Sequence, residues 1–562
     1  MHLLRSSVVL CLALAVALPA ASAADWPQWR GPNRDGVAPE SPPLADAWPV
    51  GIPRFVWRTE RLLNQGHESG HSSPVVAYGR VFLYVNRMDK TAPGGAQDGL
   101  VCLNAGTGTK LWSVEYPADS QNEVRSQGGT PCVVAGRVYV TGRKRVYCFA
   151  ADSGRLLWQS PIPSQRDGIS SSFAVVAGVA VVNACGFIGF DAQTGAVRWQ
   201  HSEGPMNGGL GKVWGDYPSP VPWPHGGKTY ILCCRLKVTC LDPATGDALW
   251  EMPWENGGSW WGNSSPAVTG DTMVIQRHDG LECYILSEQG PREIWHIPHH
   301  EVASTPVLYQ GHVYTLGGGD YGRRATVCCA TLENGDVTWE RDLDEAGCST
   351  PIVADGKLFG YVDSGRKLAM WRTSPEDYAM LSLARVNADG YSSPAFSDGK
   401  LFVRLEDGVA CYDLNRGANL PPTAVMEGER MPVGATTAPE LLPQDQDVLS
   451  YGWSGGMQLF VRFDHVGQCV DFPVRVTHPG AYEISACMTR AADYGIVQFS
   501  VKGQALGAPF DGFSAHVTPT GPILLGTLNL PAGVTTLRLT IVGKNAASTG
   551  LLAGLDAMLF RR

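Results

Sequence analysis

The chain has 562 residues, which is too many for one ordinary hydrophobic core, so we expect two or more domains. Its 66 glycines and 39 prolines, with 44% hydrophobic and 17% charged residues, indicate a turn-rich globular protein and exclude a disordered or fibrous chain. The formal net charge is −9 and no basic cluster occurs, so binding to nucleic acid or to an anionic membrane is not expected.

Residues 1–23 have the pattern of a cleavable export signal. Arg5 precedes the apolar run Val8–Leu18, and Ala21-Ser22-Ala23 fits the small-residue cleavage rule. The run is too short to span a bilayer comfortably, and no other stretch predicts a membrane span. Cys11 lies inside the run, so a lipid anchor is not indicated. The sequence predicts a periplasmic or secreted protein.

A lead-in follows over residues 24–54. Its first part, Asp25–Glu40 (DWPQWRGPNRDGVAPE), is rich in aromatic residues, Pro and Gly. We expect it to pack across one face of the next domain.

One sequence unit recurs through residues 55–416 and is clearest at Val238–Trp250 (VTCLDPATGDALW). An apolar run is followed by a polar turn with Gly and then by Trp. Since Gly tolerates positive φ, the unit predicts two strands joined by a tight turn, with the Trp ring sealing the contact to a neighbouring unit. Copies end at Trp112, Trp158, Trp199, Trp250, Trp295 and Trp339, and a degenerate copy lies near Met380-Leu381.

A second marker precedes each copy and consists of Ser/Thr-Pro or a near equivalent. The eight markers are Ser73-Pro74, Thr130-Pro131, Ser172-Phe173, Ser219-Pro220, Ser265-Pro266, Thr305-Pro306, Thr350-Pro351 and Ser393-Pro394. Four short strands per repeat, at a spacing of about 40–57 residues, predict an all-β, eight-bladed propeller.

The two ends of the repeat array have complementary deficits. Phe55–Arg58 carries the repeat tryptophan, Trp57, without preceding strands, whereas Tyr391–Asn415 has its first strands but no Trp strand. We expect the two fragments to complete one blade, which removes the last free sheet edge.

The repeat resembles the tryptophan-docking repeat of the quinoprotein propellers, over about Trp26–Asn415. Some members of that group are alcohol dehydrogenases that use pyrroloquinoline quinone (PQQ), and others are non-catalytic, such as the propeller lipoprotein of outer-membrane assembly. The enzymes need a Ca²⁺ carboxylate/amide set and a catalytic Asp on added loops, and these do not map one by one onto this chain.

Six cysteines share one repeat position before the turn: Cys102, Cys148, Cys240, Cys283, Cys329 and Cys411. Equivalent positions in neighbouring blades are too far apart for a disulfide, so we expect small buried side chains. Cys233-Cys234 and Cys328-Cys329 leave a vicinal disulfide open, although successive strand residues face opposite ways. No C-x-x-C-H haem site or paired C-x-x-C zinc pattern occurs.

Residues 417–440 contain several prolines without apolar periodicity and are interpreted as a linker. Alternating runs then predict a β-sandwich or jelly roll over residues 441–562. Its strings HPGAYEISACMTRAADYGIVQFSVKGQALG and GLDAMLF resemble the β-sandwich modules of carbohydrate-active enzymes. That resemblance implies weak glycan binding, with Trp453, Tyr494, Phe510 and Phe513 as candidate stacking rings or, alternatively, core residues.

Two catalytic motifs match by letter only. His67–His71 fits H-E-x-x-H, but Gly66 and Gly70 interrupt the helix that a zincin needs. Gly452–Gly456 fits G-x-S-x-G, but a strand-like run follows it where a nucleophile elbow needs a helix.

The stronger functional signal is positional, because the loop before each innermost strand of a propeller opens on the central channel. Polar and aromatic residues gather in these loops, where rings beside convergent polar groups suit a planar or sugar-like ligand. His residues near a carboxylate could also hold a divalent metal. The alternative is that the rings plug the channel. The candidate ligand-binding residues are Trp214, Asp216, Trp260, Trp261, Asn263, His299, His300, Glu301, His67, His71 and Arg125, and the same loops contain Gln127, Asp167, Asp389 and Tyr391.

The sequence favours an exported, non-catalytic binding or scaffold protein with no cofactor and with a protein or carbohydrate partner. The alternative function is a PQQ-dependent oxidoreductase that binds PQQ with Ca²⁺, and an unrecognised hydrolase or lyase at the channel mouth is a third reading.

Overall fold

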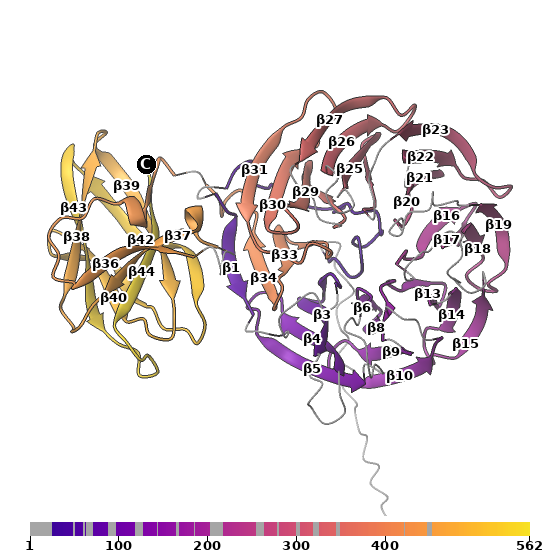
Figure 1. Ribbon diagram of the computed structural model, residues 1–562, viewed down its shortest axis with the longest axis horizontal. Coiled ribbons are helices and arrows are strands. Elements are labelled where there is room, and N and C mark those ends of the chain that lie inside the picture. Colours follow the sequence, from indigo (N-terminus) through magenta and orange to yellow (C-terminus); the bar gives the residue numbers. More distant parts are fainter. Residues whose placement is uncertain are drawn as a thin grey trace, which may run out of the picture.

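The computed structural model describes residues 25–48, 51–59, 62, 71–87, 97–117, 127–142, 144–163, 168–184, 186–202, 217–235, 237–253, 264–277, 280–298, 304–317, 325–343, 349–420, 422–446 and 452–562. These residues form a ring of β-sheets with a two-sheet sandwich at its side (Figure 1). No helix in these ranges is long and apolar enough to cross a bilayer.

The ring contains eight four-stranded antiparallel sheets within the described ranges, which confirms the predicted eight-bladed propeller. Each blade runs from an inner strand at the channel to an outer strand carrying the repeat Trp or its substitute. Blade 1 contains β2 (Val75–Ala77), β3 (Arg80–Arg87), β4 (Gln97–Asn104) and β5 (Lys110–Pro117), and blade 2 contains β7 (Cys132–Val134), β8 (Arg137–Thr141), β9 (Arg145–Ala150) and β10 (Leu156–Pro161). Blade 3 contains β12 (Ala174–Val176), β13 (Val179–Asn183), β14 (Phe187–Asp191) and β15 (Val197–His201), and blade 4 contains β16 (Val221–His225), β17 (Lys228–Cys234), β18 (Lys237–Leu241) and β19 (Ala248–Pro253).

The remaining blades follow the same order. Blade 5 contains β20 (Ala267–Thr269), β21 (Thr272–Arg277), β22 (Gly280–Ile285) and β23 (Arg292–Pro298), and blade 6 contains β24 (Val307–Tyr309), β25 (His312–Gly317), β26 (Ala325–Thr331) and β27 (Val337–Leu343). Blade 7 contains β28 (Ile352–Ala354), β29 (Lys357–Val362), β30 (Lys367–Arg372) and β31 (Met380–Arg385), and blade 8 contains β32 (Ala395–Ser397), β33 (Lys400–Arg404), β34 (Val409–Asp413) and β1 (Arg54–Arg58). A short parallel pair, β6 (Gln127–Gly128) with β11 (Gly168–Ile169), joins two loops before inner strands.

Strands from both ends of the repeat array close the ring. β1 pairs antiparallel with β34, with Trp57 opposite Cys411, so the N-terminal strand is the outer strand of blade 8. The degenerate copy near Met380 is the outer strand of blade 7, as predicted. Closure of this kind leaves no blade without its outer strand.

Five of the repeat tryptophans bond to the next blade. The indole N–H of Trp57 donates to the carbonyl of Ala105 at 2.9 Å, and Trp158, Trp199, Trp295 and Trp339 make the equivalent bond to the following blade. Gly108 shows why the turn needs glycine: its φ is +71°, and a Cβ atom there would lie 2.4 Å from the Trp57 ring.

The repeat cysteines lie opposite the tryptophans on the neighbouring strand, as in the pairs Cys102 with Trp112 and Cys240 with Trp250. None of the described cysteines is in a disulfide, and all but Cys469 are buried. Burial raises the pKa of the Cys240 thiol to about 12, so it acts as a small apolar side chain.

A ring of hydrogen bonds through the Ser/Thr markers explains their hydroxyls. The backbone N–H of Ser73 donates to Thr130 Oγ1 at 2.9 Å, and the N–H of Ser393 returns to Ser73 Oγ at 2.8 Å. At five more markers the backbone N–H donates to the hydroxyl of the next marker in the same way. The step between Thr130 and Ser172 differs, because there the Ser172 hydroxyl donates to the Thr130 carbonyl. The markers therefore join all eight inner strands around the channel.

The lead-in does more than cover one face, because it fills the channel. Trp26 pairs with Val76 in blade 1, and Val37 pairs with Val353 in blade 7. Between them, buried Arg30 donates to the carbonyls of Thr305 and Pro306 at 3.0 and 2.7 Å. Buried Arg34 reaches the carbonyls of Ser172 and Phe173 on blade 3.

The sandwich has two facing sheets. The first contains β36 (Glu440–Asp445), β37 (Met457–Arg462), β44 (Leu552–Arg561), β39 (Gly480–Arg490) and β42 (Thr518–Leu530), with β35 (Ala424–Glu427) beside β44; the second contains β38 (Cys469–Val476), β43 (Gly533–Gly543), β40 (Ile496–Val501) and β41 (Gln504–Asp511). Phe472, Ile484, Val497, Leu539 and Leu555 belong to the core between the sheets. This confirms the predicted β-sandwich.

Residues 417–440, the predicted linker, contain ordered structure that pairs with the sandwich. Residues 424–427 form β35, which pairs with β44, and η1 (Gly428–Arg430) follows it directly. Asn419 is also fixed, since its amide bonds to the carbonyls of Asp413 and Asn415 while its oxygen accepts the N–H of Arg54. Backbone pairing supplies an order here that apolar periodicity did not reveal.

The propeller and the sandwich share one buried apolar cluster. It contains Trp48, Phe55 and Trp57 of the lead-in and β1, and Trp453 and Leu559 of the sandwich. In Figure 1 the sandwich lies beside β1, the strand that closes the ring.

Candidate functional site

Most of the predicted channel-mouth residues cannot be placed. Trp214, Asp216, Trp260, Trp261, Asn263, His299, His300, Glu301, His67 and Arg125 lie outside the described residues, as does Asp167. The structure describes the sector where blades 7, 8 and 1 meet, with His71, Asp389 and Tyr391.

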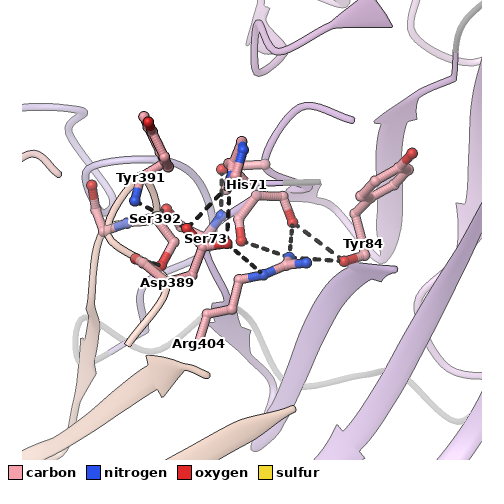
Figure 2. Close-up of polar contacts among 10 residues, drawn as sticks. His71, Ser73, Tyr84, Asp389, Tyr391, Ser392 and Arg404 are labelled. Carbon is pink, nitrogen blue, oxygen red and sulfur yellow. Dashed lines mark hydrogen bonds and ion pairs between the residues drawn. The ribbon is translucent and has the colours of Figure 1, made fainter. Parts of the chain in front are cut away.

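His71 and Asp389 form the centre of this sector (Figure 2). His71 directly precedes marker Ser72-Ser73-Pro74 of blade 1, and Asp389 lies in the loop before β32 of blade 8. His71 Nδ1 lies 3.1 Å from each carboxylate oxygen of Asp389. The contact fixes the orientation of the imidazole and leaves Nε2 directed away from the carboxylate.

Arg404 supports the Asp389 carboxylate from below. Its side chain is completely buried at the end of β33, and Nε lies 3.5 Å from Asp389 Oδ2. Nη1 donates to the Ser72 carbonyl at 2.9 Å, to Ser72 Oγ and to the Tyr84 carbonyl, so this arginine also ties blade 8 to blade 1 (Figure 2).

A short turn places Tyr391 over the histidine. Asp389 Oδ1 accepts the N–H of Tyr391 at 3.0 Å, and the Asp389 carbonyl accepts the N–H of Ser392. Asp residues favour turns of this type because the side chain can bond to the backbone two residues on. The Tyr391 and His71 rings then lie 4.4 Å apart, and Tyr391 is 45% exposed. Among the Trp, Tyr and Phe side chains of the described part of the chain, it is the one that is exposed.

The charges keep Asp389 ionised. Burial acts to raise the pKa of the Asp389 carboxyl, but His71, Arg404 and the Tyr391 N–H outweigh it and lower the pKa to about 2. Burial lowers the pKa of the Arg404 guanidinium, and Asp389 opposes that shift.

The lead-in arginines are buried inside the channel. Burial lowers the pKa of Arg30 to about 9 and that of Arg34 to about 10. Both guanidinium carbons lie 5.6 Å from the centre of the Trp29 ring. Trp29 and the two arginines therefore form one packed layer inside the ring.

Comparison with known proteins identifies the repeat. The family model described as "Outer membrane protein assembly factor BamB" matches residues 96–257 and 235–379, which together span half of the chain. The chain belongs to this PQQ-like propeller-repeat family. A curated relative, the outer membrane protein assembly factor BamB of Burkholderia pseudomallei (strain K96243), is 33% identical over 204 residues. The match covers 34% of this chain and 46% of that relative, so the chain spans less than half of its length.

Several solved structures have the same propeller fold as this chain. The quinohemoprotein alcohol dehydrogenase of Comamonas testosteroni superposes with a TM-score of 0.52 at 12% identity, over 73% of this chain and 83% of its own. A europium-containing methanol dehydrogenase gives a TM-score of 0.51 at 14% identity, over 72% and 93%. At these identities the likeness shows the fold alone.

The structure also bears on two smaller predictions. Ser454 of the G-x-S-x-G string is buried in the 3₁₀ turn η2 (Ser454–Gly456), donates to Glu427 and is followed by β37, so it is no nucleophile elbow. Trp453, Tyr494 and Phe510 are core residues and not glycan-stacking rings, because each is at least nine-tenths buried. The metal prediction stays untested, because His299, His300 and Glu301 lie outside the described residues; within the described ranges, no three His, Cys, Asp or Glu residues are grouped to hold a metal ion.

Arg404 was missed by sequence reasoning, but the repeats contain a signal for it. Strand registers place Arg404 at a position filled in the other blades by uncharged residues: Tyr84, Thr141, Asn183, Cys234, Gln276, Leu316 and Tyr361. A single charged residue at a buried repeat position that is uncharged in the other blades indicates that a group of opposite charge lies nearby.

Proposed function

We propose that this protein is a non-catalytic scaffold of the periplasm that binds a partner protein at the mouth of its propeller. Membership in the family described by an outer membrane assembly factor supports a role in protein assembly. The observation that carries the proposal is the exposed Tyr391 ring on the fixed His71 imidazole.

The arrangement suits recognition better than chemistry. Tyrosine offers a large, rigid contact surface with little conformational entropy to lose, and such rings are enriched where proteins bind each other. Asp389 is engaged by His71, Arg404 and a backbone N–H. The described sector thus presents a fixed binding surface and contains no nucleophile beside a free base.

A quinone is not part of this proposal. PQQ carries several carboxylates, which need cationic or hydrogen-bonding partners. Among the described channel residues, Arg30 and Arg34 donate to backbone carbonyls, and Arg404 lies against Asp389. These residues do not fit PQQ, so we propose that the protein works without it.

We propose a protein partner in preference to a carbohydrate. Sugars bind by stacking on exposed rings. In the sandwich, Trp453 donates its indole N–H to Thr489, and Tyr494 accepts a hydrogen bond from Gln458 inside the core. These rings serve the fold of the sandwich.

Site-specific photo-crosslinking in the periplasm tests the proposal. A photoreactive residue at position 391 should give discrete adducts with an envelope protein. The matched control is position 156 on β10, since Leu156 is 44% exposed, nearly the same as Tyr391, but lies on the outer strand of blade 2. Equal adducts at both positions, or none at 391, would contradict binding at the mouth.

A further inference from the structure

Three carboxylates and one serine gather where the sandwich meets the propeller. Glu427 ends β35, Glu429 lies in η1 and Asp556 lies in β44. Ser454 bonds to two of them: its N–H donates to Asp556 Oδ1 at 2.9 Å, and its hydroxyl donates to Glu427 Oε1 at 2.9 Å.

Local backbone geometry forces the carboxylates together. Gly428 separates the two glutamates, and a Cβ atom there would lie 2.0 Å from the carbonyl oxygen of Leu555. Only glycine lets η1 lie this close to β44. Asp556 is 2% exposed, and the Glu429 side chain is 9% exposed. Oε2 of Glu427 and Oε2 of Glu429 are buried without a hydrogen-bond partner.

Few cations balance this charge. Arg430 on η1 lies 3.5 Å from Glu429 but is 81% exposed, so water screens it. Arg54 of β1 and the Cys487 thiol of β39 line the cavity beside Asp556. Burial, with Glu427 and Glu429 adding to it, raises the pKa of Asp556 well above its ordinary value. Burial and Glu429 likewise raise the pKa of Glu427.

The cluster adjoins the contact between the two domains. Asp556 and Gly452 line a small cavity with Ile52 and Phe55 of the propeller side. Trp453, next to Ser454, belongs to the apolar cluster that joins the domains. A change in the bonds of Ser454 therefore acts on residues that hold the sandwich to β1.

We propose that residues 452–456 form a proton-dependent latch between the propeller and the sandwich. With Asp556 and Glu427 protonated, these two buried groups carry no like charges, so η1 packs against β44 and Trp453 stays in the shared core. The two bonds from Ser454 favour the ionised carboxyls and oppose this effect, but burial and the neighbouring glutamates outweigh them. Ionisation brings buried like charges together, which loosens the turn and the domain contact.

The sign of the pH dependence follows from linkage. A carboxyl whose pKa is raised in the folded state stabilises that state most below its ordinary pKa, and the stabilisation is lost as pH rises through the raised value. An exported protein meets the pH of its surroundings, so the latch would make the domain contact respond to it.

The test is calorimetry of the full chain between about pH 5 and pH 9 in a buffer with a chelator. We expect the melting temperature of the sandwich to fall as pH rises, and proteolysis near residues 416–422 to increase. Asp556→Asn should flatten this dependence, and Glu427→Gln should reduce it. The control is Asp471→Asn, because Asp471 pairs with Arg538 in the other sheet and its pKa is lowered.

Three results would overturn the latch. One is a melting temperature that does not fall with pH in the unmodified protein. Another is the same pH dependence in Asp556→Asn and Glu427→Gln as in the unmodified protein. The third is a rise in melting temperature when a divalent cation is added to the chelated protein but not to Asp556→Asn, because the cluster would then hold a cation and not a proton.

Discussion

Replacing Asp389 by Asn should destabilise the propeller strongly, although the two side chains have the same shape. The variant leaves the guanidinium of Arg404, which is completely buried, without its carboxylate. Removing one partner of a buried ion pair typically costs about 3–5 kcal/mol. The shift of the Asp389 pKa from 3.8 to about 2 gives a smaller estimate, about 2 kcal/mol. We expect about 3 kcal/mol, because the variant also leaves a charge uncompensated.

Urea unfolding at two pH values measures this loss. The pKa of Asp389 is lowered in the folded state, so its stabilisation is present above about pH 4 and lost as pH falls toward about 2. The difference between Asp389→Asn and the unmodified protein should therefore shrink in acid. Asp407→Asn is the control, because the ion pair between Asp407 and Arg58 is more exposed than the pair between Asp389 and Arg404. Its loss should lower the free energy of unfolding by about 1 kcal/mol or less. A loss below about 1 kcal/mol for Asp389→Asn at neutral pH would refute the reasoning.

Three further predictions concern the closure and the domain boundary. Deleting residues 24–58 should lower the melting temperature by many degrees, since it removes β1 and the channel-filling arginines; a monomeric deletion variant of unchanged stability would contradict the closure. Ser393→Ala should cost about 1–3 kcal/mol in urea unfolding, because the buried N–H of Thr350 loses its acceptor, whereas Ser393→Thr should restore most of it. A sandwich fragment that begins at residue 422 should melt higher than one that begins at 440, because only the longer one keeps β35 on β44; equal melting temperatures would show that β35 adds nothing.

The propeller was predictable because its information is local and repeated. Each Ser/Thr marker, turn glycine and tryptophan specifies strands that pair with their sequence neighbours, and eight copies fix the period. The closure of the ring was also predictable, because Trp57 lies on an outer strand without inner strands and Tyr391–Asn415 has inner strands without an outer one. The hydroxyl ring was not, because its bonds join markers that are about 40–57 residues apart and depend on the ring being closed.

The site was predictable only in outline. The loops before the inner strands were chosen by position, and His71, Asp389 and Tyr391 do lie together in one of them and its neighbour. Arg404 belongs to no sequence motif, and it stands out as the one charged residue at its repeat position only when the strand registers align the blades. Arg30 and Arg34 were expected at a face and lie inside the channel, because their bonds go to backbone carbonyls, which leave no trace in a sequence.

The domain junction was the least predictable part. Prolines at residues 417–440 indicated a linker, yet the pairing of β35 with β44 and the bonds of Asn419 order this stretch. The carboxylate cluster depends on Gly428 lying against β44, about 130 residues further along the chain. Long-range contacts of this kind cannot be derived from local periodicity.

Calorimetric titration of the purified protein with PQQ and Ca²⁺ tests most directly whether it is a scaffold or a quinone enzyme. Our account predicts no heat of binding, no change in melting temperature and no quinone-dependent dye reduction. Stoichiometric binding of PQQ with a raised melting temperature would contradict it and would favour a PQQ-dependent oxidoreductase.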